Sequence, residues 1–318
     1  MTIGIAVTGP DAGLAAFEAL RAVERVSRGA IGGFVSFVAI GAEGSLLRAQ
    51  TQRGGTRTLF TRGETTGVEP PTAFAEARFA ALISSGPDRP EPLAQFTPAD
   101  PGVGLISGHR LPNVPGVDGV PLNQAVLRRL AEGTPPKLAI EAELARNPDA
   151  DVGLIALDLQ GRLHLANSRF VAQRADLGSA LMEDAQSGAA VAVLHNAIHP
   201  HRAPAALAAS VALDRMAPAD RCDFRVVLQA GLRLELGDEN CLHLDAEDRV
   251  ERLTVTQACW LEPAHQGAAV NFAAAVRRKG ELVGHATSEP YCVAKEGRLQ
   301  SVSGQAAASI PVRTIQRA

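Results

Sequence analysis

The sequence predicts an α+β protein with stacked layers of sheets and helices. Three observations predict this class: one β-hairpin pattern occurs three times, a strand, a polar loop and a helix precede each copy, and the composition is that of a globular chain. The chain has 318 residues, of which 46% are hydrophobic and 4% aromatic, so Ala, Val and Leu fill a sizeable core. We predict a single compact unit of three modules, residues 1–100, 101–188 and 189–318.

Each predicted hairpin consists of an apolar strand, a four-residue turn ending in glycine, and a second strand. The clearest copy is residues 152–168, where Gly161 can adopt the positive φ that closes such a turn. Repetition of one pattern along a chain indicates a repeated module. The other copies are residues 34–52, with Gly44, and residues 270–288, with Gly280.

The helices that precede the hairpins are amphipathic. Ala16, Leu20 and Val23 fall on one side of the first helix, and charged residues fall on the other side. Pro204 suits the first turn of the third helix, where a missing N–H costs nothing. An insertion between the third helix and its hairpin, residues 222–262, predicts at least two extra strands. The three helices are expected at residues 14–26, 122–132 and 204–216.

Composition and charge narrow the classes of partner. A net charge of −3 and a pI near 6.3 do not provide the excess of positive charge expected of a protein that binds nucleic acid or an anionic membrane. The first residues lack the features of a signal peptide, and no apolar run approaches the ~20 residues of a membrane-spanning helix. We therefore expect a cytoplasmic protein with a small-molecule substrate; a homo-oligomer is left open.

Four cysteines lie in the last third of the chain without CxxC spacing. In strand-like segments such cysteines are expected to be small buried hydrophobic residues rather than disulfides or zinc ligands. No cofactor and no resident metal are expected. The cysteines are Cys222, Cys241, Cys259 and Cys292.

The loops that follow the first strand of each module supply candidate site residues. If a pseudo-threefold axis relates the modules, these loops meet, and loops at strand ends are where such folds place function. Asp11 and Asn113 are alternatively helix caps or turn formers. Our substrate-binding candidates among the loop residues are His109, Arg110, Asn113 and Asn196. The full set is Thr8, Asp11 and Gly13 from the first loop, Ser107, His109, Arg110 and Asn113 from the second, and His195, Asn196, His199 and His201 from the third.

The segment HNAIHPH, residues 195–201, is the densest group of titratable side chains. A histidine there could act as a general base near neutral pH, and we take His195 and His199 as catalytic candidates. Shared metal binding and a hydrogen-bonded structural role remain open alternatives.

A glycine pair next to an arginine predicts an anion site. Arg53 precedes Gly54 and Gly55, whose free N–H groups could form an anion nest beside the guanidinium. Arg53 or Arg89 could hold a carboxylate bidentately, although a solvated surface arginine is the commoner outcome.

Thr2 offers a different kind of chemistry. Met1 is commonly removed before a small residue, which would leave a free α-amine beside the Thr2 hydroxyl. Such an amine can serve as the base for its own side chain. Many ordinary proteins also begin with Met-Thr.

The central module is similar to part of a known family. Residues 104–133, a short helix and residues 147–168 resemble N-terminal-nucleophile hydrolases, in particular the isoaspartyl peptidase and asparaginase family, and residues 31–55 resemble the same hairpin pattern. The resemblance covers about a quarter of the chain, and the hairpin pattern has low specificity. In that family a threonine precedes the Val-Gly of the hairpin and becomes the nucleophile, whereas Asp151 stands there in this chain. The resemblance therefore implies that Thr2 is the N-terminal nucleophile that remains.

These observations lead to two hypotheses. The first is an amide-bond hydrolase acting on a small polar or cyclic amide, with Thr2 as nucleophile or auxiliary group, His195 or His199 as general base, and an oxyanion site at Gly54 and Gly55. In it Arg53 and Arg110 bind substrate oxygens. The second is a non-enzymatic ligand-binding or assembly protein. An enzyme should bring several of these side chains into one site, and an assembly protein should bury them separately.

Overall fold

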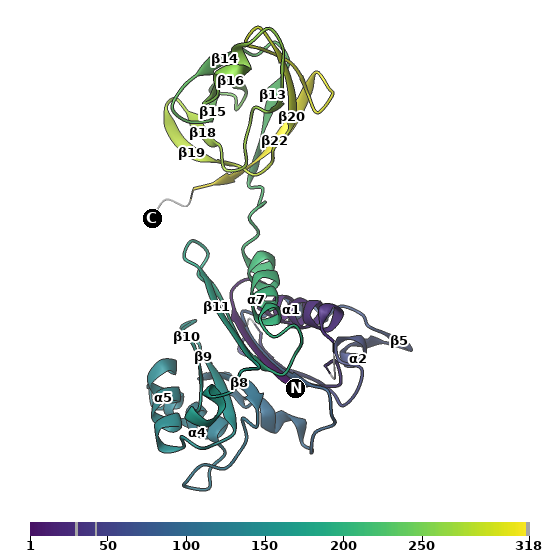
Figure 1. Ribbon diagram of the computed structural model, residues 1–318, viewed down its shortest axis with the longest axis vertical. Helices are drawn as coiled ribbons and strands as arrows, with labels where there is room; N and C mark the ends of the chain where they lie inside the picture. The colour runs from purple at the N-terminus through teal and green to yellow at the C-terminus, as the bar shows by residue number, and fades with distance from the viewer. Residues whose placement is uncertain (29–30, 42, 316–318) are drawn as a thin grey trace. The chain divides into compact units, whose positions relative to one another are not determined.

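The computed structural model describes residues 1–28, 31–41 and 43–315 and has the mixed α+β composition that the sequence predicts. It divides into two compact units, Met1–Ala217 and Pro218–Ala318, rather than the single unit predicted (Figure 1). The difference arises because the third hairpin pairs within the second unit, whereas the helix that precedes it packs in the first.

The first sheet of the first unit is antiparallel and has six strands. Helices α1 (Ala12–Val26) and α7 (Ala203–Met216) pack on one face of it, because alternate residues of each strand point to that face. Its strands, in the order β11-β12-β1-β6-β2-β3, are Leu177–Asp184, Ala189–Asn196, Thr2–Thr8, Phe79–Ser85, Phe34–Ile40 and Leu46–Thr51.

The second sheet is covered by α4 (Leu122–Ala131) and α5 (Pro136–Arg146). Its other face packs on the first sheet through a separate apolar cluster that includes Ala6, Leu105 and Ile155. The first unit therefore has four layers, helices, sheet, sheet and helices (Figure 1). The strands, in the order β10-β9-β8-β7, are Leu163–Asn167, Val152–Asp158, Gly104–Arg110 and Ala99–Asp100.

Two glycines allow the sheets to touch through their backbones. A Cβ atom on Gly4 in β1 would overlap the carbonyl group of Gly108 in β8. The absence of side chains at this crossing brings the start of β1 close to the end of β8. This contact positions the candidate site.

Short elements complete the first unit. Near α1 they enclose an aromatic cluster in which the rings of Phe37 and Phe74 lie 4.6 Å apart and those of Phe17 and Phe60 lie 5.7 Å apart. The elements are α2 (Thr56–Leu59), β4 (Thr61–Arg62), β5 (Thr65–Thr66), α3 (Thr72–Ala75), η1 (Leu93–Phe96) and α6 (Arg169–Ala172).

The second unit is built almost entirely from strands around Trp260 and aliphatic residues. Strands β13 to β16 confirm the extra strands predicted for residues 222–262. One sheet has the order β13-β22-β19-β18-β15-β16-β14 and the other β17-β20-β21. The elements are β13 (Phe224–Gln229), β14 (Leu234–Leu236), β15 (Cys241–Leu244), β16 (Val250–Val255), η2 (Ala258–Leu261), β17 (His265–Ala268), β18 (Ala275–Arg278), β19 (Glu281–Ala286), β20 (Tyr291–Lys295), β21 (Arg298–Val302) and β22 (Ala307–Thr314).

The local patterns predicted from the sequence are present, but the three loops do not meet. The hairpins β2–β3, β9–β10 and β18–β19 form, and so do helices α1, α4 and α7. Because β1 and β12 are antiparallel neighbours, with Thr2 opposite Asn196, the loop after β1 lies at the far end of the sheet from the loop after β12. The start of β1, not its end, lies beside the other two loops.

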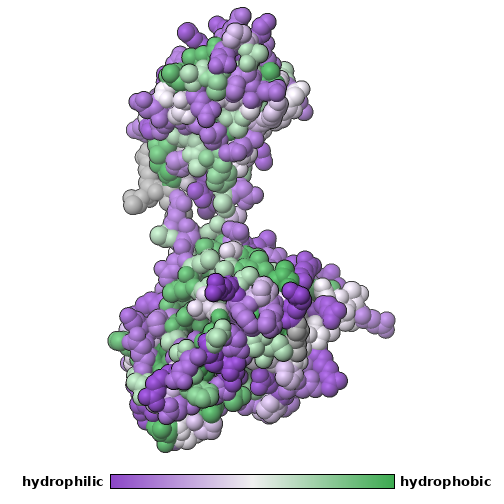
Figure 2. Space-filling view, in the orientation of Figure 1, coloured by the Kyte–Doolittle hydropathy of each residue, from purple (hydrophilic) through white to green (hydrophobic). Residues whose placement is uncertain are grey.

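The face shown in Figure 2 carries hydrophilic residues interspersed with small hydrophobic patches in both units. Within the part of the chain that the structure describes, no helix combines the length and apolar character needed to cross a membrane.

Candidate functional site

Thr2 lies at the start of β1 with its side chain directed toward the second sheet. Its neighbours across the sheet are Asn196 in β12 and Ser85 in β6. The backbone N–H of Arg110 donates to Thr2 Oγ1 over 2.7 Å, and Thr2 Oγ1 donates to Asn196 Oδ1 over 2.6 Å. Thr2 is 2% exposed, and its buried hydroxyl acts both as a donor and as an acceptor in these two hydrogen bonds. Three predicted site residues therefore meet at one oxygen atom.

The arginine that contributes the backbone donor has an unusual conformation. Arg110 ends β8 with a φ of 65°, in the left-handed region that non-glycine residues seldom occupy. Its side chain makes a bidentate ion pair with Asp151, in which Nη2 lies 2.6 Å from Oδ2. This ion pair holds Arg110 at the strand end while its N–H faces Thr2.

His109 lies behind Asn196 and links the two sheets. Its Nε2 lies 2.7 Å from Oδ1 of Asn167 and its Nδ1 lies 3.3 Å from Oδ1 of Asn196. Burial lowers the pKa of His109 and so favours its neutral form. A neutral ring carries one N–H, so it donates to only one of these two oxygens. The ring crosses Gly153 of β9 to reach Asn167, and a Cβ atom on Gly153 would overlap both side chains. His109 therefore orients the amide that accepts from Thr2.

Three arginines surround the amine of Met1. The pKa of that amine is lowered by burial and then by the positive charges of Arg89, Arg110 and Arg174. Arg110 pairs with Asp151, as described above, and Arg174 pairs bidentately with Asp176. Arg89 is different, because its Nε donates to Ser85 Oγ over 3.1 Å and it has no ion pair among the described residues. Its half-buried guanidinium is thus available to an anion. We call this group of residues the Thr2 cluster: Thr2, Ser85, Arg89, His109, Arg110, Asn167 and Asn196.

His195 lies on the other face of the first sheet, away from the Thr2 hydroxyl. It is opposite Ile3 in the strand register, and it therefore faces α7 rather than the second sheet. It is fully buried, and neither ring nitrogen has a hydrogen-bond partner in the described structure. The sheet thus separates His195 from Thr2, which corrects the prediction that it acts as the base for this hydroxyl.

His199 is exposed in the loop before α7, and its ring lies 4.0 Å from that of His201. Like His195, it makes no side-chain hydrogen bond to the Thr2 cluster among the residues that the structure describes. The described residues contain no group of three histidine, cysteine or acidic side chains placed to hold a metal ion.

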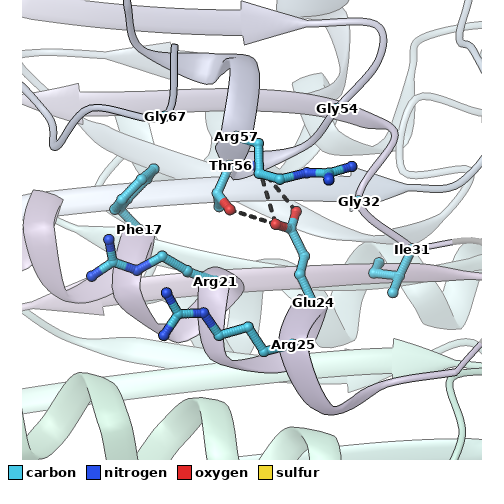
Figure 3. Close-up of a pocket in the computed structure, with 10 residues that line it drawn as sticks. All are labelled: Phe17, Arg21, Glu24, Arg25, Ile31, Gly32, Gly54, Thr56, Arg57 and Gly67. Carbon is cyan, nitrogen blue, oxygen red and sulfur yellow. Dashed lines mark hydrogen bonds between the residues drawn. The ribbon is translucent and has the colours of Figure 1, made fainter. Parts of the chain in front are cut away.

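The predicted anion nest holds a carboxylate of the chain itself. Gly55 N–H donates to Gly33 O over 2.9 Å, and the next N–H, that of Thr56, donates to the carboxylate of Glu24 (Figure 3). Arg53 is solvent-exposed and pairs with Asp88 over 2.7 Å. The residues Arg53, Gly54 and Gly55 therefore form a separate region and supply no oxyanion site for Thr2.

Sequence reasoning both missed and misplaced residues of the cluster. Asn113, a substrate-binding candidate, instead donates to Gln95 over 2.8 Å in the loop before α4. Asn167 was not a candidate, although it ends β10, and a polar residue that ends an apolar strand is the signal that could have found it.

The comparisons with known proteins follow the division into units. A family profile described as a domain of unknown function, DUF7259, matches residues 231–307, within the second unit. No curated protein matches the sequence. A second profile, described as a domain of unknown function, DUF6963, matches residues 2–225, and thus begins at Thr2 and spans the whole Thr2 cluster. Because this match covers most of the chain, the protein belongs to the DUF6963 family.

Proposed function

We propose that the protein is an amide-bond hydrolase of the N-terminal-nucleophile class with Thr2 as its nucleophile. The observation that carries the proposal is the position of the Thr2 hydroxyl. It lies at the first residue of β1, on the face of the first sheet that packs on the second sheet, and Arg110 N–H and Asn196 Oδ1 fix it there. The packing of the two sheets supports the proposal, because it places the Thr2 hydroxyl among the polar side chains at the ends of β8 and β12.

The mechanism requires Thr2 to be the first residue of the mature chain. Its α-amine then accepts the hydroxyl proton while Oγ1 attacks the amide carbon, forming an ester with the enzyme and releasing the substrate amine, which takes up a proton. Water next hydrolyses the ester and returns the hydroxyl. The burial and the arginines that lower the pKa of the Met1 amine would act on the new amine as well and would favour its neutral form, which can accept a proton.

The other residues of the cluster have supporting roles in this proposal. His109 is a positioning residue that fixes the Asn196 amide, and Arg89 receives a carboxylate of a small polar substrate. The histidines His195 and His199 have no part in the reaction, since the amine replaces them as base.

The proposal includes two further points, the compartment of the protein and the relation between its repeated segments. We place the reaction in the cytoplasm, where cysteines remain free, and Cys222, Cys241, Cys259 and Cys292 are all unpaired with one another. We also propose that the three strand-loop-helix-hairpin copies are related modules, of which the third is divided between the units.

The test combines the intact mass of the protein with amide hydrolysis. We expect a mass that lacks Met1, and we expect Thr2→Ala to lower kcat/KM at least about 1,000-fold toward small amides that also carry a carboxylate. Thr2→Ser should retain measurable activity because it keeps the hydroxyl. Thr8→Ala is the matched control, since Thr8 is equally buried at the other end of the same strand, and it should leave kcat/KM within about threefold of that of the unmodified protein if it remains folded.

Other results would contradict the proposal. A protein that hydrolyses amides while retaining Met1, or equal activity in Thr2→Ala, removes Thr2 as nucleophile. Retained Met1 without any hydrolysis favours the ligand-binding alternative.

A further inference from the structure

A thiol and an imidazole lie against each other in the second unit. Cys259 belongs to η2 and His265 begins β17, and Sγ of Cys259 lies 3.4 Å from Nε2 of His265. Both residues are partly exposed, so a small molecule in solution can approach the pair. The Thr2 cluster belongs to the first unit, and the pair is therefore a separate site.

The core of the second unit fixes both members of the pair. Trp260, which follows Cys259 in η2, is 3% exposed and belongs to the hydrophobic core. Its ring lies 4.5 Å from that of His265 at an interplanar angle of 82°. The backbone of His265 is in addition paired with Ala294 of β20. The contact between thiol and imidazole is thus built on a buried ring and a strand pairing.

The other three cysteines differ from Cys259 in exposure or in partner. Cys241 and Cys292 are 1% and 0% exposed, and burial raises the pKa of each thiol. Such thiols are inert, because they stay protonated and out of reach. Cys222 is exposed, but its Sγ donates to the main-chain oxygen of Phe224. Among the described residues, Cys259 alone combines access from solvent with a contact to a histidine.

We propose that Cys259 is a site of reversible modification by low-molecular-weight disulfides, with His265 as its base. In the neutral ring that carries its proton on Nδ1, Nε2 accepts the thiol proton while Sγ attacks one sulfur atom of the added disulfide. The S–S bond of that disulfide breaks as the bond to Cys259 forms, and the released thiolate takes the proton from His265. Cys259 is thereby oxidised, and one half of the added disulfide is reduced to a thiol. Attack by another thiol reverses the exchange.

The test incubates the full chain with oxidised glutathione and follows the mixed disulfide at each cysteine by mass spectrometry of its peptides. We expect Cys259 to react at least about tenfold faster than Cys222, although Cys222 is the more exposed, because only Cys259 has an adjacent base. Equal rates at the two cysteines, or a faster reaction at Cys222, would overturn the inference. This comparison is made within the unmodified protein, so it does not depend on the folding of any variant.

The variant His265→Gln tests the role of the imidazole. It should lower the rate at Cys259 at least about tenfold and change the rate at Cys222 by less than about twofold, because it removes the base from one thiol only. Cys241 and Cys292 should stay unmodified, since they are buried in the folded second unit. An unchanged rate at Cys259 would remove His265 as the base.

The matched control is His285→Gln. His285 is also a partly exposed histidine of the second unit, but its Nδ1 lies 3.2 Å from the main-chain oxygen of Ala273 rather than beside a thiol. This variant should leave the rate at Cys259 within about twofold of that of the unmodified protein. A loss as large as that in His265→Gln would contradict the proposal.

Discussion

At the scale of single residues, the buried His195 makes the stability of the first unit depend on pH. Burial lowers its pKa to about 4, with smaller contributions from His109 and His201. In the unfolded chain the pKa is about 6.5, so below that pH the unfolded state binds a proton that the folded state does not. The stability contributed by neutral His195 is therefore fully present above pH 6.5 and is lost as the pH falls toward 4.

We predict that the free energy of unfolding decreases with acidification by up to about 1.4 kcal/mol per pH unit through His195 between pH 6.5 and 4. Urea unfolding of the unmodified protein and of His195→Leu at several pH values would measure this, because the variant cannot titrate there and should show the shallower dependence. His199→Leu, which removes an exposed histidine of the following loop, should keep the steep dependence. Parallel curves for the unmodified protein and His195→Leu would contradict the prediction.

The sequence could not distinguish His195 from His109. Each histidine lies within the last two residues of an apolar strand, and the two faces of a strand that is buried on both sides look alike in a sequence. The structure separates them, since His109 faces the space between the sheets and His195 faces α7. Thr2, Arg110 and Asn196 were predicted with the right residue types, but the pairings that join them span more than 100 residues.

At the scale of elements, the crossing of β1 and β8 determines whether the Thr2 cluster forms. We predict that Gly4→Ala destabilises the first unit by about 1–3 kcal/mol or more, because its Cβ atom would meet the backbone of Gly108 rather than a side chain that can move. The added Cβ atom would push β1 away from β8 and so would also lengthen the Arg110–Thr2 hydrogen bond. Urea unfolding measures the first effect, and amide hydrolysis the second.

Gly102→Ala is the comparison for this prediction. Gly102 lies in an exposed turn, and its Cβ atom would meet only a carboxylate oxygen of Asp100, at 3.3 Å. A change of less than about 0.5 kcal/mol is expected there. Equal stability of Gly4→Ala and Gly102→Ala would show that the two sheets adjust without cost.

The elements that the sequence predicted well are those fixed by neighbouring residues. Turn glycines such as Gly161 set the hairpins, and the 3.6-residue repeat of α1 marks its buried face. Which strands become neighbours is not fixed locally. The order β12-β1-β6 joins residues from three distant segments, and for this reason the expected meeting of all three loops was wrong.

At the scale of the whole molecule, the boundary after Ala217 divides two hydrophobic cores. One includes Phe17 and Leu20, and the other is built around Trp260. Local patterns missed this boundary because strand and turn signals continue across it. Only the pairing partners show that residues 218–318 form sheets of their own.

We predict that polypeptides of residues 1–217 and 218–318 fold independently, because each contains its own core. Each should unfold cooperatively in urea, and the first should retain the Thr2-dependent hydrolysis proposed above. A first polypeptide that is soluble yet unfolds without a cooperative transition would show that one unit requires the other.

The donor to Thr2 belongs to the main chain of Arg110 rather than to its side chain. Replacing this residue therefore removes the ion pair with Asp151 but keeps a backbone N–H that can donate to Thr2, except in the case of proline, which lacks the N–H. Sequence variation at position 110 would then record how well each residue tolerates the left-handed backbone, with glycine and asparagine favoured, and would reveal nothing of the hydrogen bond. A relative could thus preserve this interaction while conserving no side chain there.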